Sequence, residues 1–152
     1  MGKYTKDHVR DYATAAFKFY AKEGSVKKYI EKMAEQMKQT DEQMGIQQGV
    51  CKPTEAALLR KERVMQERIS EIADLEAVER TLHILGSLGS GREIRKAIEY
   101  VYFEDSWKDL EKGDIHNRVH HAEIFISASE RQIYYWLKKA RTTLAEERGL
   151  RL

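Results

Sequence analysis

Basic and amide side chains share one side of a segment in the last quarter of the chain. At about 100° per residue, Arg131, Tyr135 and Lys138 fall on one helical face, with Gln132 and Lys139 beside them. Guanidinium and carboxamide groups can pair with base edges in the major groove of duplex DNA. Ammonium groups further along a helix suit phosphates. The spacing therefore predicts a helix that contacts a polyanion.

The predicted contacts divide by position along this helix. Arg131, Gln132 and Tyr135 are predicted to read bases. The residues predicted to contact phosphates are Ser129, Lys138, Lys139 and Arg141. The alternative is a solvated charged face on a bundle helix. Adjacent aromatic residues at positions 134–136 count against that alternative, because a single helical face cannot bury all of them.

The opposite side of the segment is apolar at helical spacing. Its predicted buried residues are Ile133, Leu137, Ala140 and Leu144. Ser129 is placed to cap this helix. A shorter helix is predicted before it, with Asp114 as its cap, Val119 and Ala122 on its apolar face, and a short step near Ser127 after it. Helix, tight turn and helix together predict a helix-turn-helix unit.

Histidines gather on the shorter helix. His116 and His120 are four residues apart, a spacing that can hold a transition metal, and His121 follows directly. No third ligand is apparent beyond Asp114 or Glu123. Histidines at the start of a helix near DNA can instead touch phosphate. We therefore expect no metal and no cofactor.

The inventory of catalytic groups is poor. The glycines of residues 86–91 lack the following Lys-Ser or Lys-Thr of a phosphate-binding loop. Cys51 has no histidine near it in sequence, and no carboxylate stands in an apolar setting that would tune its acidity. We therefore expect no catalytic residues and no enzyme.

The sequence before residue 41 predicts a pair of helices. Apolar residues at steps of three and four predict a first helix, with Thr5 as a candidate cap and Gly24 as its end, and a second helix capped by Ser25. Phe17 and Tyr20 are expected in the core rather than stacked on bases. The lysines that could extend a DNA footprint are Lys18, Lys22, Lys27 and Lys28. Glycines and a proline predict a loop over residues 41–53.

Nothing in the sequence breaks a helix between Thr54 and Leu85. A helix of this length favours pairing, and one expected arrangement is a homodimer formed through it. The other is two helices with a bend near Asp74, packed within one chain. The apolar seam does not decide between them, because it lacks a run of strict heptads.

Residues 86–91 contain three glycines and two serines around one leucine, and this run predicts a linker at residues 87–91. It would separate a helical region, residues 1–86, with a possible role in oligomerisation, from a helix-turn-helix domain, residues 92–152. About sixty residues suffice for a small domain that folds alone.

The predicted C-terminal domain opens with Ser90 and Glu93 at capping-box spacing. A helix with apolar residues at steps of three and four follows. Residues 104–113 form a polar connection in which Trp107 and Leu110 are expected to turn inward.

Composition limits the function classes. The net charge is only +2, but six basic and three acidic residues give residues 129–152 a net charge of +3. The single cysteine excludes an internal disulfide and fits a reducing compartment. No apolar run approaches the ~20 residues needed to span a bilayer, and the N-terminal segment lacks the apolar core of a signal peptide. We expect a cytoplasmic protein without a membrane partner.

The run SERQIYYWLKKAR resembles the recognition helix of sigma-factor region 4, which usually reads Ser-x-x-Thr-Val before a basic stretch ending Lys-x-Ala-Arg. Gln132 and Ile133 stand at the Thr and Val positions. The layout of residues 94–150 is similar to that of phage transcriptional regulators of the ArpU/RinA type. Ser127 replaces their usual turn glycine, and Glu123 stands where a small residue is expected.

This resemblance implies an all-α protein that binds double-stranded DNA in a bacterial host cell and controls transcription of phage late genes, with RNA polymerase as a further partner. Two other functions stay open. One is a DNA-packaging component, a small terminase subunit, which would form ring-sized oligomers. The other is a sigma-like module that docks on RNA polymerase without binding DNA itself.

Overall fold

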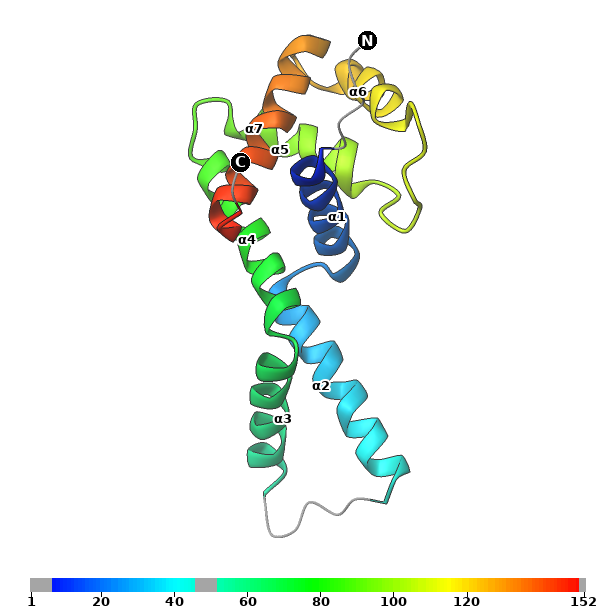
Figure 1. Cartoon of the computed structure of the whole chain (residues 1–152), viewed down its shortest axis with the longest axis vertical. Helices are drawn as coiled ribbons and strands as arrows, with labels where there is room; N and C mark the ends of the chain where they lie inside the picture. Colours follow the sequence, from blue (N-terminus) through cyan, green and yellow to red (C-terminus); the bar gives the residue numbers. More distant parts are fainter. Residues whose placement is uncertain (1–6, 46–51, 151–152) are drawn as a thin grey trace.

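The computed structural model describes residues 7–45 and 52–150, and within these ranges it contains helices and turns but no strand (Figure 1). The α-helices are α1 (His8–Glu23), α2 (Val26–Gln43), α3 (Pro53–Glu67), α4 (Ile69–Gly86), α5 (Gly91–Ile98), α6 (Asp114–Phe125) and α7 (Glu130–Arg148), and a π-helical turn, η1 (Glu99–Phe103), extends α5. The predicted all-α class is confirmed.

The first two helices begin and end where local chemistry requires. The Asp7 carboxylate accepts a backbone N–H bond at the start of α1, and Gly24 ends that helix with φ 89°. The Ser25 hydroxyl then accepts the corresponding bond at the start of α2. The predicted boundary at Gly24 and Ser25 is confirmed, whereas Thr5 lies outside the described residues.

One hydrophobic core joins α1, the second half of α4, α5, η1, α6 and α7 into the body of the molecule. Phe17 of α1 and Tyr102 of η1 stack at its centre, with ring centroids 5.3 Å apart and both side chains fully buried. Phe17 is therefore a core residue, as predicted, and Tyr20 packs partly buried against the same cluster. This core includes residues from both sides of the predicted linker at 87–91.

Helices α2 and α3 lie side by side and extend away from the body as an arm (Figure 1). A smaller core fixes the base of the arm through Tyr29, Val64, Ile72 and Leu75. The predicted apolar stripe of α2, including Met33 and its neighbours, packs against this cluster. The arm is therefore held by its own core as well as by α4.

The prediction of one continuous helix between Thr54 and Leu85 is wrong. The chain leaves the helical conformation at Arg68 (φ −113°, ψ 30°), which ends α3 and starts α4. Beyond the break, the first half of α4 shares the smaller core with Val64 of α3 and with α2, and its second half packs in the body. The two-helix alternative is thus closer, with the bend at Arg68 rather than near Asp74.

The turn between α4 and α5 is tight. The amides of Ser87, Leu88 and Gly91 donate to carbonyls three residues earlier. The predicted capping box is not formed, because the Ser90 side chain makes no capping hydrogen bond to α5. Gly91 instead brings the start of α5 against the end of α4, within van der Waals contact of the Gly86 backbone.

The structure of residues 104–114 corrects two further expectations, namely that Trp107 turns inward and that Asp114 caps α6. Residues 104–113 contain no helix, and the Trp107 side chain is 69% exposed beside Lys108, not turned inward. Asp114 is the first residue of α6 rather than its cap, and its carboxylate accepts the Glu111 amide N–H bond at 2.7 Å.

Hydropathy separates these helices from bilayer-spanning ones. Among the residues placed in the structure, no helix combines the length and the apolar character needed to cross a membrane.

Candidate nucleic-acid interface

The position of α7 is set at both ends and along one face. The Ser129 hydroxyl accepts the Gln132 amide N–H bond at 3.2 Å, as its predicted capping role requires, and Gly149 ends the helix with φ 76°. The predicted inward residues are all buried: Ile133, Leu137, Ala140 and Leu144. The side of α7 that stays outside is therefore determined by the core.

Five of the residues predicted to contact DNA lie on that outer side. They are Arg131, Gln132, Tyr135, Lys138 and Lys139, and all are exposed. None of the ion pairs formed within residues 7–45 and 52–150 engages one of the three basic members. Their charge is therefore available to a partner molecule.

Arg141 differs from these five. Its guanidinium donates to the Tyr102 hydroxyl at 2.9 Å, and the side chain is partly buried. Because Tyr102 belongs to the core, this bond turns Arg141 away from the exposed face and toward α1. A phosphate bound by Arg141 would have to approach from that side.

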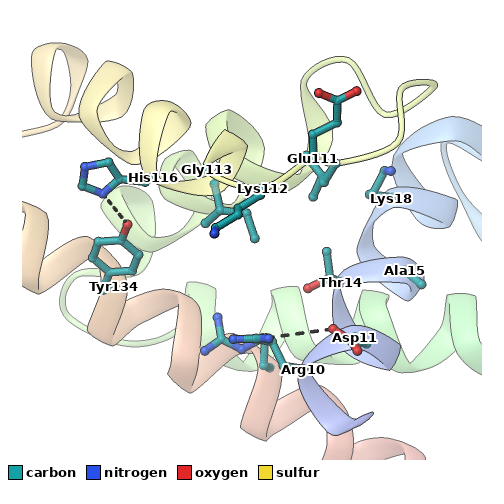
Figure 2. A pocket seen from close by; sticks show the side chains of 13 residues that line it. Arg10, Asp11, Thr14, Ala15, Lys18, Glu111, Lys112, Gly113, His116 and Tyr134 are labelled. Atoms are coloured by element: carbon teal, nitrogen blue, oxygen red, sulfur yellow. Dashed lines mark hydrogen bonds and ion pairs between the residues drawn. The ribbon is translucent and has the colours of Figure 1, made fainter. Parts of the chain in front are cut away.

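A cleft of about 870 Å³ opens on that side, between α1, the segment before α6, and α7 (Figure 2). Four basic residues line it against two acidic ones, namely Arg10, Lys18, Lys112 and Arg141 against Asp11 and Glu111. Arg10 and Asp11, which are neighbours on α1, form an ion pair drawn in Figure 2, with 4.0 Å between Nε and Oδ1. Lys18 donates to the Lys108 carbonyl at 2.6 Å.

The cleft matters because it borders the exposed face of α7. Tyr134 and Arg141 line it, and on a helix they neighbour Lys138. Of the lysines predicted to extend a DNA footprint, Lys18 lines the same cleft from α1, on the side opposite Tyr134 (Figure 2). Lys112 joins it from a segment for which the sequence predicted only a polar connection. Separation along the chain hid this proximity.

The structure explains why the connection between α6 and α7 is apolar. After Phe125 the chain is extended at Ile126 (φ −116°, ψ 134°), and the Ile126 side chain is only 4% exposed. An apolar residue therefore anchors the turn to the core and holds the start of α7 against α6. By contrast, Ile124 and Phe125 are exposed at the end of α6.

The far end of α7 is tied to two other helices. The Arg148 guanidinium donates to Asp74 of α4 at 2.6 Å, and the Tyr12 hydroxyl of α1 donates to the same carboxylate. Burial, and then the hydrogen bond with Asp74, raise the pKa of Tyr12. The hydrogen bond that Arg148 donates to Asp74 raises the pKa of Arg148. This cluster restrains the direction of α7.

Near its start, α7 also meets the histidines of α6. His116 Nδ1 lies 3.0 Å from the Tyr134 hydroxyl (Figure 2), and Glu130 lies close to both His116 and His120. Burial, followed by the charge of Glu130, raises the pKa of Tyr134. Glu130 was not predicted as a partner of the histidines, because it belongs to the next helix.

Comparison with family models, with curated proteins and with solved structures finds no match for this chain.

Proposed function

We propose that this protein binds double-stranded DNA in a sequence-specific manner and regulates transcription. One observation carries the proposal, namely the exposed side of α7. Its first turns carry Arg131, Lys138 and Lys139 together with Gln132 and Tyr135, while the opposite side is locked in the core. A rigid helix with donors for base edges and cations for phosphates has the chemistry that groove recognition needs.

In the proposed binding mode, Arg131, Gln132 and Tyr135 contact base edges in the major groove. Lys138, Lys139 and the exposed backbone at Ser129 contact phosphates. The basic rim of the cleft, including Lys18 and Lys112, would add phosphate contacts on one flank. These contacts would be largely independent of sequence and would set the register of the protein on the duplex.

The biological role follows from the resemblance of residues 129–141 to sigma-factor region 4. We propose control of phage late genes within the cytoplasm of a bacterial host, of the ArpU/RinA type. Contact with RNA polymerase belongs to the same proposal, since regulators of this kind act at promoters. The proposal includes no catalytic step.

Self-association through the arm forms part of the proposal. The outer side of the arm exposes Leu58, Leu59, Met65 and Ile69, which are between 49% and 69% exposed. Because α2 covers the Val64 side of α3, a second copy would pack on this other side. A dimer would present two α7 helices to two half-sites.

The test is selection of bound sequences from a random duplex pool, with the mass of the protein measured on the same sample. Enrichment of a defined motif is expected, and a palindrome with a dimer mass would indicate a two-fold complex. Ring-sized oligomers would favour a packaging subunit. No enrichment at low salt, together with co-purification of RNA polymerase, would refute DNA binding in favour of a docking module.

Two substitutions separate the predicted roles on the selected site. Arg131→Ala should weaken specific binding by about 5- to 150-fold, corresponding to ~1–3 kcal/mol, and relax one base position. Lys138→Ala should weaken all sequences alike and reduce the salt slope by about one. Lys38→Ala is the control, because Lys38 is an exposed lysine on α2, in the arm. If Arg131→Ala behaves like this control, the recognition assignment is wrong.

A further inference from the structure

Three side chains that can bind metals converge where α6 meets the start of α7. His116 and His120 come from successive turns of α6, and Glu130 is the first residue of α7. The two Nε2 atoms lie 3.0 Å apart. Glu130 Oε2 lies 3.9 Å from His120 Nε2, and Glu130 Oε1 lies 3.5 Å from His116 Nδ1. One ligand atom from each residue lies within 4.8 Å of the others.

The outer nitrogens of both imidazoles also have partners. His116 Nδ1 lies 3.0 Å from the Tyr134 hydroxyl, and His120 Nδ1 lies 4.0 Å from the Glu123 carboxylate. A proton on Nδ1 directed at such a partner leaves the Nε2 lone pair free. His116 thus has the arrangement of a metal-binding histidine, whose second nitrogen typically donates to a carboxylate, a carbonyl or another polar group, and a carboxylate lies near the second nitrogen of His120, beyond hydrogen-bond distance. Both Nε2 atoms therefore face a common point.

The spacing matches a small divalent ion. Zinc–nitrogen bonds of ~2.0–2.1 Å in a tetrahedron place neighbouring ligand atoms about 3.3 Å apart. The 3.0 Å between the two Nε2 atoms is slightly below this value. The 3.9 Å between His120 Nε2 and Glu130 Oε2 is slightly above it. Small side-chain rotations therefore suffice to bring all three donors to bonding distance.

We propose that His116, His120 and Glu130 bind one divalent transition-metal ion that links α6 to α7. Two imidazoles and one carboxylate suit zinc and its neighbours in the first transition row, rather than calcium or magnesium, which prefer all-oxygen sites. Water completes the coordination, because the two histidines are exposed. The ion can enter directly from solvent.

Binding would have two consequences for α7. The ion would add a cross-link between two helices already joined by the turn at Ile126, by the shared core and by the contact of His116 with Tyr134, and it would thereby restrain the first turn of α7. It also neutralises the negative charge of Glu130 beside Arg131. If α7 contacts DNA as proposed above, metal should strengthen that contact. The metal site itself does not depend on DNA binding.

The experiment uses full-length protein without a histidine tag, stripped of metal by chelation. Zn²⁺ is titrated at neutral pH against a chromophoric chelator in the absence of DNA, and thermal unfolding is followed with and without Zn²⁺. The wild type should bind one ion per chain and unfold at a higher temperature when Zn²⁺ is present. Acidification should abolish binding, because imidazole must be neutral to bind a metal.

Four variants locate the site. His120→Gln and Glu130→Gln should each lower the Zn²⁺ affinity by more than tenfold and lose the thermal shift. Tyr134→Phe, which removes an outer partner, should weaken binding by about 10- to 100-fold. His121→Gln is the matched control, because this exposed histidine of α6 faces Tyr100 and Phe125 instead.

The control should bind like the wild type. Failure of the wild type to compete with the chelator overturns the proposal, as does equal Zn²⁺ affinity in His120→Gln and the wild type. Comparison of urea midpoints without metal establishes that each variant is folded. Zn²⁺ binding without any DNA binding would leave the metal site standing and refute only the proposed function.

Discussion

Substitution of Gly91 by alanine tests whether the glycine-rich stretch between α4 and α5 is a flexible linker or a packed turn. A Cβ atom at this position would lie 2.4 Å from the Gly86 carbonyl oxygen, and 2.7 Å and 2.8 Å from the Gly86 carbonyl carbon and Cα. The oxygen contact is about 1 Å shorter than the 3.4 Å at which ordinary contact begins. All three neighbours are backbone atoms, so the end of α4 or the start of α5 must move.

The expected cost follows from this overlap. Forcing an additional carbon into a packed interior typically destabilises a protein by ~1–3 kcal/mol. Gly91 itself is buried, and Ile94 and Leu85 on either side of the turn belong to the common core. Relief of the clash therefore disturbs core packing. At a urea dependence of about 2 kcal/mol/M, the unfolding midpoint should fall by ~0.5–1.5 M.

The assay is urea unfolding followed by circular dichroism, with Gly89→Ala as the matched control. An added Cβ at Gly89 meets no atom within 4 Å, and its φ is not positive, so this variant should be neutral or up to ~1 kcal/mol more stable. A flexible linker requires the two variants to behave alike. An unchanged or raised midpoint for Gly91→Ala would therefore refute the close-packed turn and support two separable domains.

Three further predictions concern what holds α7. Asp74→Asn weakens the 2.6 Å bond from Arg148 and should lower the free energy of unfolding by ~1–2 kcal/mol; an unchanged urea midpoint would show that this cluster does not restrain the helix. The pKa of Tyr12 is raised above 10.0 in the folded protein, so folding favours the protonated phenol. The stability that Tyr12 contributes in this way is therefore complete below about pH 10 and is lost as the pH rises through the pKa of the folded state. Unfolding measured between about pH 8 and 11 should therefore show a shallower alkaline loss for Tyr12→Phe, and equal slopes would contradict the shift. Ser129→Ala removes the bond to the Gln132 amide and should cost ~1 kcal/mol, read as a lower melting temperature, whereas Ser129→Gly should cost only a few tenths.

Local rules predicted the helix ends and the inward faces well. Gly24, Ser25 and Ser129 end or cap helices as expected, because a cap depends on a few neighbouring residues. The inward positions of α7, from Ile133 to Leu144, follow from helical period alone. Local rules failed at Ser90, where the position precedes a helix but the hydroxyl makes no cap.

The bend at Arg68 could not be predicted from composition, since no glycine or proline marks it. It depends on contacts between helices, since α3 and the first half of α4 share the smaller core with α2 while the second half of α4 packs in the body. The exposure of Trp107 was not predicted either. The aromatic centre of the core is formed by Phe17 of α1 and Tyr102 of η1.

The sequence by itself determined that this protein is helical and that α7 has one apolar and one basic side, because both properties depend on residue type and on a period of 3.6 residues. Only the tertiary structure decided which groups meet. It placed Lys18 and Lys112 around a cleft that α7 also lines, it placed Glu130 against His116 and His120, and it turned Arg141 toward Tyr102. Such contacts depend on how helices that are distant in the chain share a core, and no local sequence period encodes that packing.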